Sequence, residues 1–317
     1  MRIASLMPSA TEILTCLGSG SELVAVTHRC AVPEGSSASV VTLDPFGGAQ
    51  YSPKEIAVFL RMLGHASQEG VFAIDQELLS ESRPDVIIMQ GTCDVCAPGE
   101  DPEDSDVRRG LPASARVITL QPHSLGEALA DIRSIGAAVG KAPEAEKLLS
   151  DLRRRMMTVL RAAAVSARGN RPRVVLLEWV DPPIAGGMWL PELVEAAGGY
   201  PVLGVREQPG VQTPWNDIVA ARPEVLILAV MGFAADEAAG ELPLLRKREE
   251  WPTLPAVQSG RVYLLDGSRY FHRPTPNIID SLELLAAVLH PEAFDQSRHG
   301  DSIVQLSAEQ LEPLAPI

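Results

Sequence analysis

The sequence is poor in positive charge and contains no long apolar run. Among its 317 residues, Lys and Arg number 27 while Asp and Glu number 41, which gives a net charge of −14. A surface of this sign repels nucleic acid and anionic lipid, so neither is expected as a partner. No stretch approaches the ~18 apolar residues that a membrane-spanning helix needs, so membrane insertion is not expected either.

The chain also has few cysteines and few aromatic residues, and it shows no export signal. It contains 4 cysteines, and aromatic residues make up 4% of it. Arg2–Leu6 already reads as a β-strand, where a signal peptide would show a charged segment, an apolar segment and a cleavage site. We therefore predict a cytoplasmic protein whose cysteines are free thiols or ligands rather than disulfides.

What the chain does contain is a loose internal repeat. Arg83–Met89 (RPDVIIM) is echoed by Arg222–Leu228 (RPEVLIL), and Ala115–Leu120 (ARVITL) by Gly260–Leu265 (GRVYLL). Short apolar strands alternate with helical segments, a pattern typical of parallel α/β structure. We predict an α/β fold with two Rossmann-like lobes, each built on a parallel sheet.

The longest helical pattern lies between the two lobes. Ser124–Val139 reads as one helix and Ala142–Ala167 as a second helix of ~39 Å. A long bridging helix between two lobes predicts a clamshell, and the alternative is a crossover helix on one larger sheet. The predicted domains are an N-terminal lobe (1–123), bridging helices (124–170), a C-terminal lobe (171–292) and a loosely attached tail (293–317).

The first predicted strand enters a helix through Pro8 and Ser9. Ser9 and Glu12 fit the S-x-x-E capping box, and Gly18 should end this helix. A helix cap is one role for Ser9. Ligands of parallel sheets bind beyond the carboxyl ends of the strands, so contact with a hydrogen-bond acceptor or an anion is the other.

Soft metal ligands follow two strands of the first lobe. His28 and Cys30 follow one strand, and Cys93 and Cys96 follow another, so these loops should meet at one edge of the sheet. Thiolate and imidazole are ligands of zinc and of iron–sulfur clusters, which predicts a metal site formed by these four residues. A redox pair is disfavoured by the acidic segment after Cys96, and a role as pocket-wall residues remains open.

Cys16 stands apart from these four residues. It occupies an apolar position of the first predicted helix, and we expect it in the core.

Polar and aromatic residues follow the strands of the second lobe. In a chain with so few aromatics, their clustering on loops after strands favours a ligand wall over plain core packing. Charged side chains nearby would fix the orientation of the ligand. The candidates are Glu178, Trp179, Asp181, Trp189, Trp215, Phe271 and Arg273.

These segments resemble a known family. The chain is similar to the helical-backbone (class III) substrate-binding proteins with the Fe/B12 periplasmic-binding fold, and within them to a cobalamin-binding branch without export signals. A departure from that branch is Thr275 and Asn277, where Gly and Arg are usual. The resemblance rests on RIASLMPSATEIL, VTHRCAVPE, RPDVIIMQGTCDVCA, LEWVDPP, GGMWLPELVEAAGG and YFHRPTPNIIDSLELLAAVLHPE.

The resemblance implies two α/β lobes, a long bridging helix and a ligand in the cleft. Exported relatives carry vitamin B12, haem, ferric siderophores or metal ions to ABC importer components. We therefore predict a binding protein for a corrinoid (cobalamin) or a similar tetrapyrrole or iron chelate. Its tryptophans would stack on the macrocycle, and His28 would contact one face.

Two alternatives belong to other classes. One is a cytoplasmic zinc or iron protein that uses His28, Cys30, Cys93 and Cys96. The other is a thiol-dependent enzyme, although the chain has no G-x-S-x-G elbow, P-loop or H-E-x-x-H motif. Since no nucleophile and base are assembled, we do not expect an enzyme.

Overall fold

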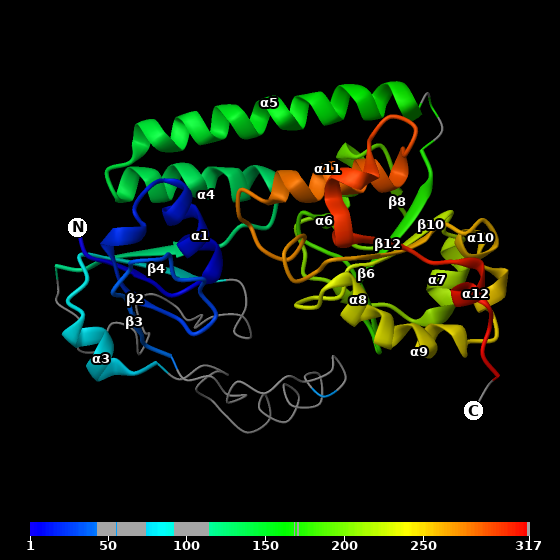
Figure 1. Cartoon of the computed structure of the whole chain (residues 1–317), viewed down its shortest axis with the longest axis horizontal. Coiled ribbons are helices and arrows are strands. Elements are labelled where there is room, and N and C mark those ends of the chain that lie inside the picture. The colour runs from blue at the N-terminus through cyan, green and yellow to red at the C-terminus, as the bar shows by residue number, and fades with distance from the viewer. Residues whose placement is uncertain (43–54, 56–73, 92–113, 168, 170, 316–317) are drawn as a thin grey trace. The chain divides into compact units, whose positions relative to one another are not determined.

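The computed structural model describes residues 1–42, 55, 74–91, 114–167, 169 and 171–315. The chain divides into two compact units, one of residues 1–122 and 126–151, the other of residues 123–125 and 152–317. Each unit is an α/β lobe, as predicted, and the division falls within the long helix α5 (Ala142–Ala167) (Figure 1). The finer domain boundaries of the sequence analysis stay a prediction.

The first lobe is built on a parallel sheet with the strand order β3-β2-β1-β4-β5. Every pairing in this sheet is parallel. Its strands are β1 (Ile3–Ser5), β2 (Leu23–Val26), β3 (Ser39–Val40), β4 (Val86–Gln90) and β5 (Arg116–Leu120). Its helices are α1 (Pro8–Cys16), the 3-10 turn η1 (Gly20–Glu22), α3 (Gln76–Glu81) and α4 (Leu125–Ala138), followed by the start of α5.

Helix α1 shows how spacing decides burial. Ala10, Ile13 and Leu14 are fully buried because they share one face at helical spacing. Cys16 falls outside that face and is exposed, so the expectation that it is a core residue is wrong. Gly18 follows the helix with φ +76°, a conformation that favours glycine, and ends it as predicted.

Helices α4 and α5 lie side by side (Figure 1). The Arg133 guanidinium pairs with the Glu146 carboxylate across them. A Cβ on Gly136 would stand 2.5 Å from the Cβ of Ala145, so this close approach requires glycine. Both helices match their predicted ranges closely. Among the described residues, no helix is long and apolar enough to cross a membrane.

The second lobe repeats the parallel order and adds antiparallel strands. Strands β8, β6, β10 and β11 are parallel neighbours, in the same order as β2, β1, β4 and β5. Strands β7, β9 and β12 pair antiparallel, so this sheet is mixed. The strands are β6 (Arg173–Val180), β7 (Pro183–Ala185), β8 (Tyr200–Pro201), β9 (Val211–Gln212), β10 (Val225–Leu228), β11 (Val262–Leu265) and β12 (Ile303–Gln305).

Short helices connect these strands around an apolar core. The α-helices are α6 (Leu190–Ala196), α7 (Trp215–Ala221), α8 (Ala235–Ala238), α9 (Leu242–Arg246), α10 (Pro255–Gln258), α11 (Ile278–Leu289) and α12 (Ala308–Leu311). The 3-10 turns are η3 (Ala239–Glu241), η4 (Trp251–Thr253) and η5 (Gln296–Ser302). Trp251 is fully buried in the core cluster.

The C-terminal segment is part of the second lobe, which corrects the expectation of a loosely attached tail. Strand β12 pairs with β11, and the side chains of Leu306 and Leu311 enter the core cluster. The Trp251 indole N–H donates to the Leu311 carbonyl at 2.9 Å. Apolar residues of the tail therefore complete a core that the rest of the lobe leaves open.

Candidate functional site

The loop after β2 lies against the carboxyl end of β1, whereas the segment with Cys93 and Cys96, which was predicted to meet this loop, lies outside the described residues. The Cys30 thiol donates to the carbonyl of Ser5, the last residue of β1, at 3.7 Å. Its sulfur also lies 3.2 Å from the Thr27 hydroxyl, and the Thr11 hydroxyl donates to the Ser5 hydroxyl at 2.8 Å. We call Ser5, Thr11, Thr27 and Cys30 the first-lobe polar cluster. It is buried and holds the loop after β2 against β1 and α1.

The start of α1 differs from the predicted capping box. The helix begins at Pro8, its N-cap is Met7, and no side chain caps it. Proline suits the first helical position because it has no N–H to leave unsatisfied, so the helix starts one residue before Ser9. Ser9 is thus inside the helix and 2% exposed. A ligand contact of Pro8 or Ser9 stays a prediction.

Half of the predicted metal site can be placed. The His28 Nδ1 lies 2.9 Å from the Thr42 hydroxyl, which also accepts the His28 backbone N–H at 3.0 Å. Cys93 and Cys96 lie outside the described residues. Within the described ranges, no group of three or more His, Cys, Asp or Glu residues could hold a metal ion. The zinc or iron site therefore stays a prediction, and Cys30 has internal hydrogen bonds.

Glu178 lies on a strand rather than on the predicted loop. Strand β6 continues to Val180 because it pairs with β7 in a hairpin. The Glu178 carboxyl packs directly against Gly210, where a Cβ would overlap it. Burial raises the pKa of Glu178 to about 7, opposed by the Gly187 backbone N–H, which hydrogen-bonds to the carboxylate. A strongly perturbed carboxyl at the carboxyl edge of a sheet is a candidate binding group.

An aromatic and thioether surface lies at the carboxyl ends of β6 and β10. The Trp179 and Phe233 rings meet edge-on, with centroids 6.4 Å apart and planes at 68°. Met231 is 39% exposed, and its backbone N–H donates to the Glu178 carbonyl at 3.0 Å. We call Trp179, Met231 and Phe233 the β6–β10 patch. Its half-buried rings and exposed thioether leave apolar surface open at the edge where ligands bind.

Sequence reasoning missed Met231 and Phe233, although the repeat could have found them. Since Arg222–Leu228 repeats Arg83–Met89, the segment after β10 is the counterpart in sequence of the segment that contains Cys93. This segment contains a methionine and a phenylalanine but no tryptophan or cysteine, so rare residue types do not mark it.

Trp189 and Trp215 are buried, which corrects the expectation that both rings form an open wall. The Trp189 indole N–H donates to the Phe271 carbonyl at 2.7 Å. The Trp215 N–H donates to the Glu250 carboxylate at 3.0 Å, and Trp215 belongs to the core cluster. A buried indole requires an acceptor for its N–H, and both have one inside the lobe. Their contact with a ligand stays a prediction.

The loop after β11 is held in place at several points. Phe271 is 1% exposed and has φ +72°, so it too is inside the lobe. The His272 Nε2 lies 2.7 Å from the Ala229 carbonyl, just after β10. Burial lowers the pKa of His272 to about 4, and the charge of Arg273 acts in the same direction. Arg273 is half-buried and Asp181 is exposed, so both remain candidate ligand contacts.

Solved structures share this two-lobed fold. A periplasmic haem-binding protein of Pseudomonas aeruginosa is 20% identical, with a TM-score of 0.66 and coverage of 92% of this chain and 93% of that one. The periplasmic vitamin B12-binding protein BtuF of Vibrio cholerae is 22% identical, with a TM-score of 0.62 and coverage of 91% and 96%. At such identities the likeness establishes the fold alone, that of two α/β lobes.

The family follows from the sequence itself. The model of the periplasmic binding protein family matches residues 3–268, so the chain belongs to that family of substrate-binding proteins. A curated relative is the uncharacterised ABC transporter substrate-binding lipoprotein YvrC of Bacillus subtilis (strain 168). It is 23% identical over 309 residues, which cover 93% of this chain and 82% of that protein.

These comparisons correct the predicted location. The family is periplasmic and the relative from Bacillus subtilis is a lipoprotein, so both point to export rather than to the cytoplasm. The prediction of a cytoplasmic protein is therefore wrong. That prediction was drawn from the first residues of the sequence alone, whereas the family model matches residues 3–268.

Proposed function

We propose that this substrate-binding protein holds a corrinoid, or a tetrapyrrole of similar size, for delivery to an ABC importer. The observation that carries the proposal is the β6–β10 patch. A macrocycle presents a broad, flat, apolar face, and the Trp179 and Phe233 rings with the Met231 thioether offer a surface of matching chemistry. Glu178 precedes Trp179 on β6 and supplies a polar group, whose carboxyl packs against Gly210.

The relatives support the ligand class. Two proteins with the same fold are named for binding haem and vitamin B12. Both ligands combine an apolar ring with polar substituents. An apolar patch and a titratable carboxyl on the same strand suit that combination, since apolar walls with few polar groups are typical of ligand sites.

The test is a titration of the purified, reduced protein with hydroxocobalamin and, separately, with haemin, followed by absorbance. Saturable binding near one equivalent is expected with hydroxocobalamin. Trp179→Ala should weaken it about tenfold or more, because aromatic contacts dominate binding energy. Binding of haemin alone would reject the corrinoid but keep the tetrapyrrole class, and binding of neither would reject the proposal.

A matched control is Tyr200→Ala. Tyr200 is 52% exposed and pairs with the first residue of β6, at the amino end of the same sheet. Its loss should leave the affinity unchanged. An equal loss in both variants would mean that Trp179 acts through the stability of the lobe and not through contact with the ligand.

A further inference from the structure

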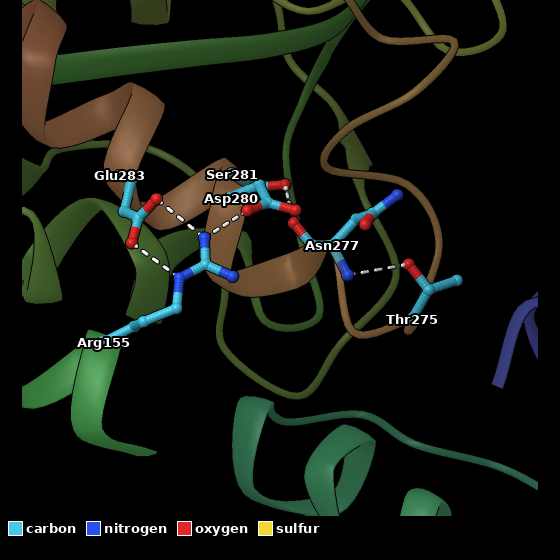
Figure 2. Close-up of polar contacts among 6 residues, drawn as sticks. All are labelled: Arg155, Thr275, Asn277, Asp280, Ser281 and Glu283. Carbon is cyan, nitrogen blue, oxygen red and sulfur yellow. Dashed lines mark hydrogen bonds and ion pairs between the residues drawn. The ribbon is translucent and has the colours of Figure 1, made fainter. Parts of the chain in front are cut away.

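A cluster of charged residues joins the long helix α5 to the first turns of α11 (Figure 2). The Arg155 Nε donates to Glu283 Oε1 at 2.9 Å, and its Nη2 donates to Glu283 Oε2 at 2.7 Å. The same nitrogen also donates to the Asp280 carboxylate. All three side chains are about one-third exposed. This bidentate geometry fixes both the distance and the direction between the two helices.

Helix α11 needs such an anchor because it is buried on almost every side. All of its residues are buried except Asp280 and Glu283. A helix with a single apolar stripe has its rotation about its own axis set by that stripe, whereas a helix that is apolar all round lacks this constraint. In α11 the two carboxylates bound to Arg155 define the rotation. Charged pairs of this kind can specify orientation even where they add little stability.

The rotation of α11 sets the loop after β11. Ser281 follows Asp280, and its hydroxyl accepts the Phe271 backbone N–H at 3.1 Å and donates to the Asn277 carbonyl at 3.2 Å. The Thr275 hydroxyl accepts the Asn277 N–H at 3.2 Å (Figure 2). Phe271 has a left-handed backbone conformation, which is costly for a residue other than glycine and is kept only by contacts with the surrounding structure. A turn of α11 would displace the Ser281 hydroxyl from that N–H.

The loop in turn contacts the strand that carries the candidate site. His272 lies against the Ala229 carbonyl, two residues before Met231 of the β6–β10 patch. Hydrogen bonds and adjacent residues therefore connect Arg155 through Ser281 and Phe271 to the end of β10. Arg155, Ser281 and Phe271 are not members of the patch itself.

We infer that Arg155 is a positioning residue for the loop of residues 271–273, acting through the rotation of α11. The same contact tunes ligand affinity. This effect on affinity rests on the proposed function, whereas the positioning of the loop does not. Arg155 lies on α5, four residues beyond the division between the two lobes. It therefore links the helix that connects the lobes to a ligand-binding loop of the second lobe.

The test is hydrogen–deuterium exchange of the ligand-free full chain, which needs no ligand. Arg155→Gln should speed exchange of the Phe271 amide by about fivefold or more. Arg155→Lys, which keeps the charge but loses the bidentate fork, should give a smaller increase. The control is Arg153→Gln, an exposed arginine on the same helix, which should change nothing. Unchanged exchange of Phe271 in Arg155→Gln would overturn the inference.

A double variant separates positioning from general destabilisation. Ser281→Ala releases the Phe271 N–H directly, so adding Arg155→Gln should speed exchange of that amide no further. Fully additive effects would show that Arg155 does not act through Ser281, and would also overturn the inference.

Titration with hydroxocobalamin then tests the effect on the ligand, at a temperature where every variant is folded. Arg155→Gln should weaken binding about fivefold, with Arg153→Gln as wild type. Faster exchange with unchanged affinity would overturn the role in ligand binding. If the wild-type chain binds no tetrapyrrole, the proposed function fails, while the exchange data still decide whether Arg155 positions the loop.

Discussion

The two lobes share a strand order but differ in chemistry at their carboxyl edges. In the first lobe, the small side chains of the first-lobe polar cluster hold the loop after β2 against β1 and α1. In the second lobe, the corresponding edge carries the β6–β10 patch and the buried carboxyl of Glu178. The same parallel framework thus supports two different surfaces. Function resides in what the strand ends carry, and the framework determines only where those ends lie.

The second difference between the lobes lies at the edges of their sheets. The second sheet gains antiparallel strands on both sides, while the described strands of the first sheet are all parallel. Strand β12 brings Leu306 and Leu311 into the core of the second lobe. The second lobe should therefore depend on its C-terminal segment for stability, and the first lobe should not.

The largest expected effect tests that dependence. Trp251→Ala removes a fully buried ring and the donor to the Leu311 carbonyl, which should cost about 3–5 kcal/mol of the free energy of unfolding of the second lobe. All four tryptophans lie in this lobe, so urea unfolding followed by tryptophan fluorescence reports on it.

Trp251→Phe serves as the control. It keeps most of the ring volume and loses the hydrogen bond, so it should cost about 1–2 kcal/mol. A midpoint for Trp251→Ala equal to that of the wild type would contradict the view that the tail and the core of this lobe depend on each other.

The next largest effect concerns Glu178. Its pKa is raised from 4.5 to about 7, so between these values the folded state binds more protons than the unfolded state. The stability of the second lobe should therefore fall as the pH rises from about 4.5 to 7. Glu178→Gln removes this dependence, and at pH 8 it should be more stable than the wild type by about 1–3 kcal/mol.

The measurement is the urea midpoint as a function of pH, with Glu249→Gln as the control because Glu249 is exposed. Equal pH profiles for the wild type and Glu178→Gln would show that this carboxyl is not the titrating group. If Glu178→Gln is more stable but binds hydroxocobalamin more weakly, Glu178 contributes to ligand binding and lowers the stability of the lobe.

The parallel framework could be predicted from the sequence, because its signals are long and periodic. The range predicted for the long helix is the one observed, Ala142–Ala167, and the repeated RPDVIIM and RPEVLIL segments are β4 and β10. The short edge strands β9 and β12 carry too little pattern to be recognised. Their existence depends on the partner strand, which only the folded chain supplies.

The candidate site could be predicted less well, since burial of a tryptophan is a tertiary property. Trp189 and Trp215 sit at helix entries, where sequence alone leaves them open to solvent. In the fold, the Phe271 carbonyl and the Glu250 carboxylate accept their N–H groups and place both rings inside. The Trp179 N–H donates instead to the carbonyl of the exposed residue Asp181, and its ring remains half-buried at the edge of the sheet.

A smaller effect concerns the edge of the first lobe. Cys30→Ala removes the thiol from the first-lobe polar cluster, which should cost about 1–2 kcal/mol, whereas Cys16→Ala on the exposed face of α1 should cost less than about 0.5 kcal/mol. Hydrogen exchange of the first-lobe amides distinguishes the two. Elemental analysis of the same samples tests the metal prediction, since loss of bound zinc or iron in Cys30→Ala alone would support it.

The smallest effect tests the repeat itself. Arg83 and Arg222 begin the repeated segments, and both have a left-handed backbone, with φ +41° and +44°. Glycine relieves the cost of this conformation but is freer in the unfolded chain, so Arg83→Gly and Arg222→Gly should each stabilise their lobe by about 0.5–1 kcal/mol. Exchange of the slowest amides in each lobe measures both. Equal increases in the free energy of unfolding would show that the two lobes keep the same turn for the same reason. An increase in one lobe alone would mean that the arginine of the other lobe makes side-chain contacts that glycine cannot replace.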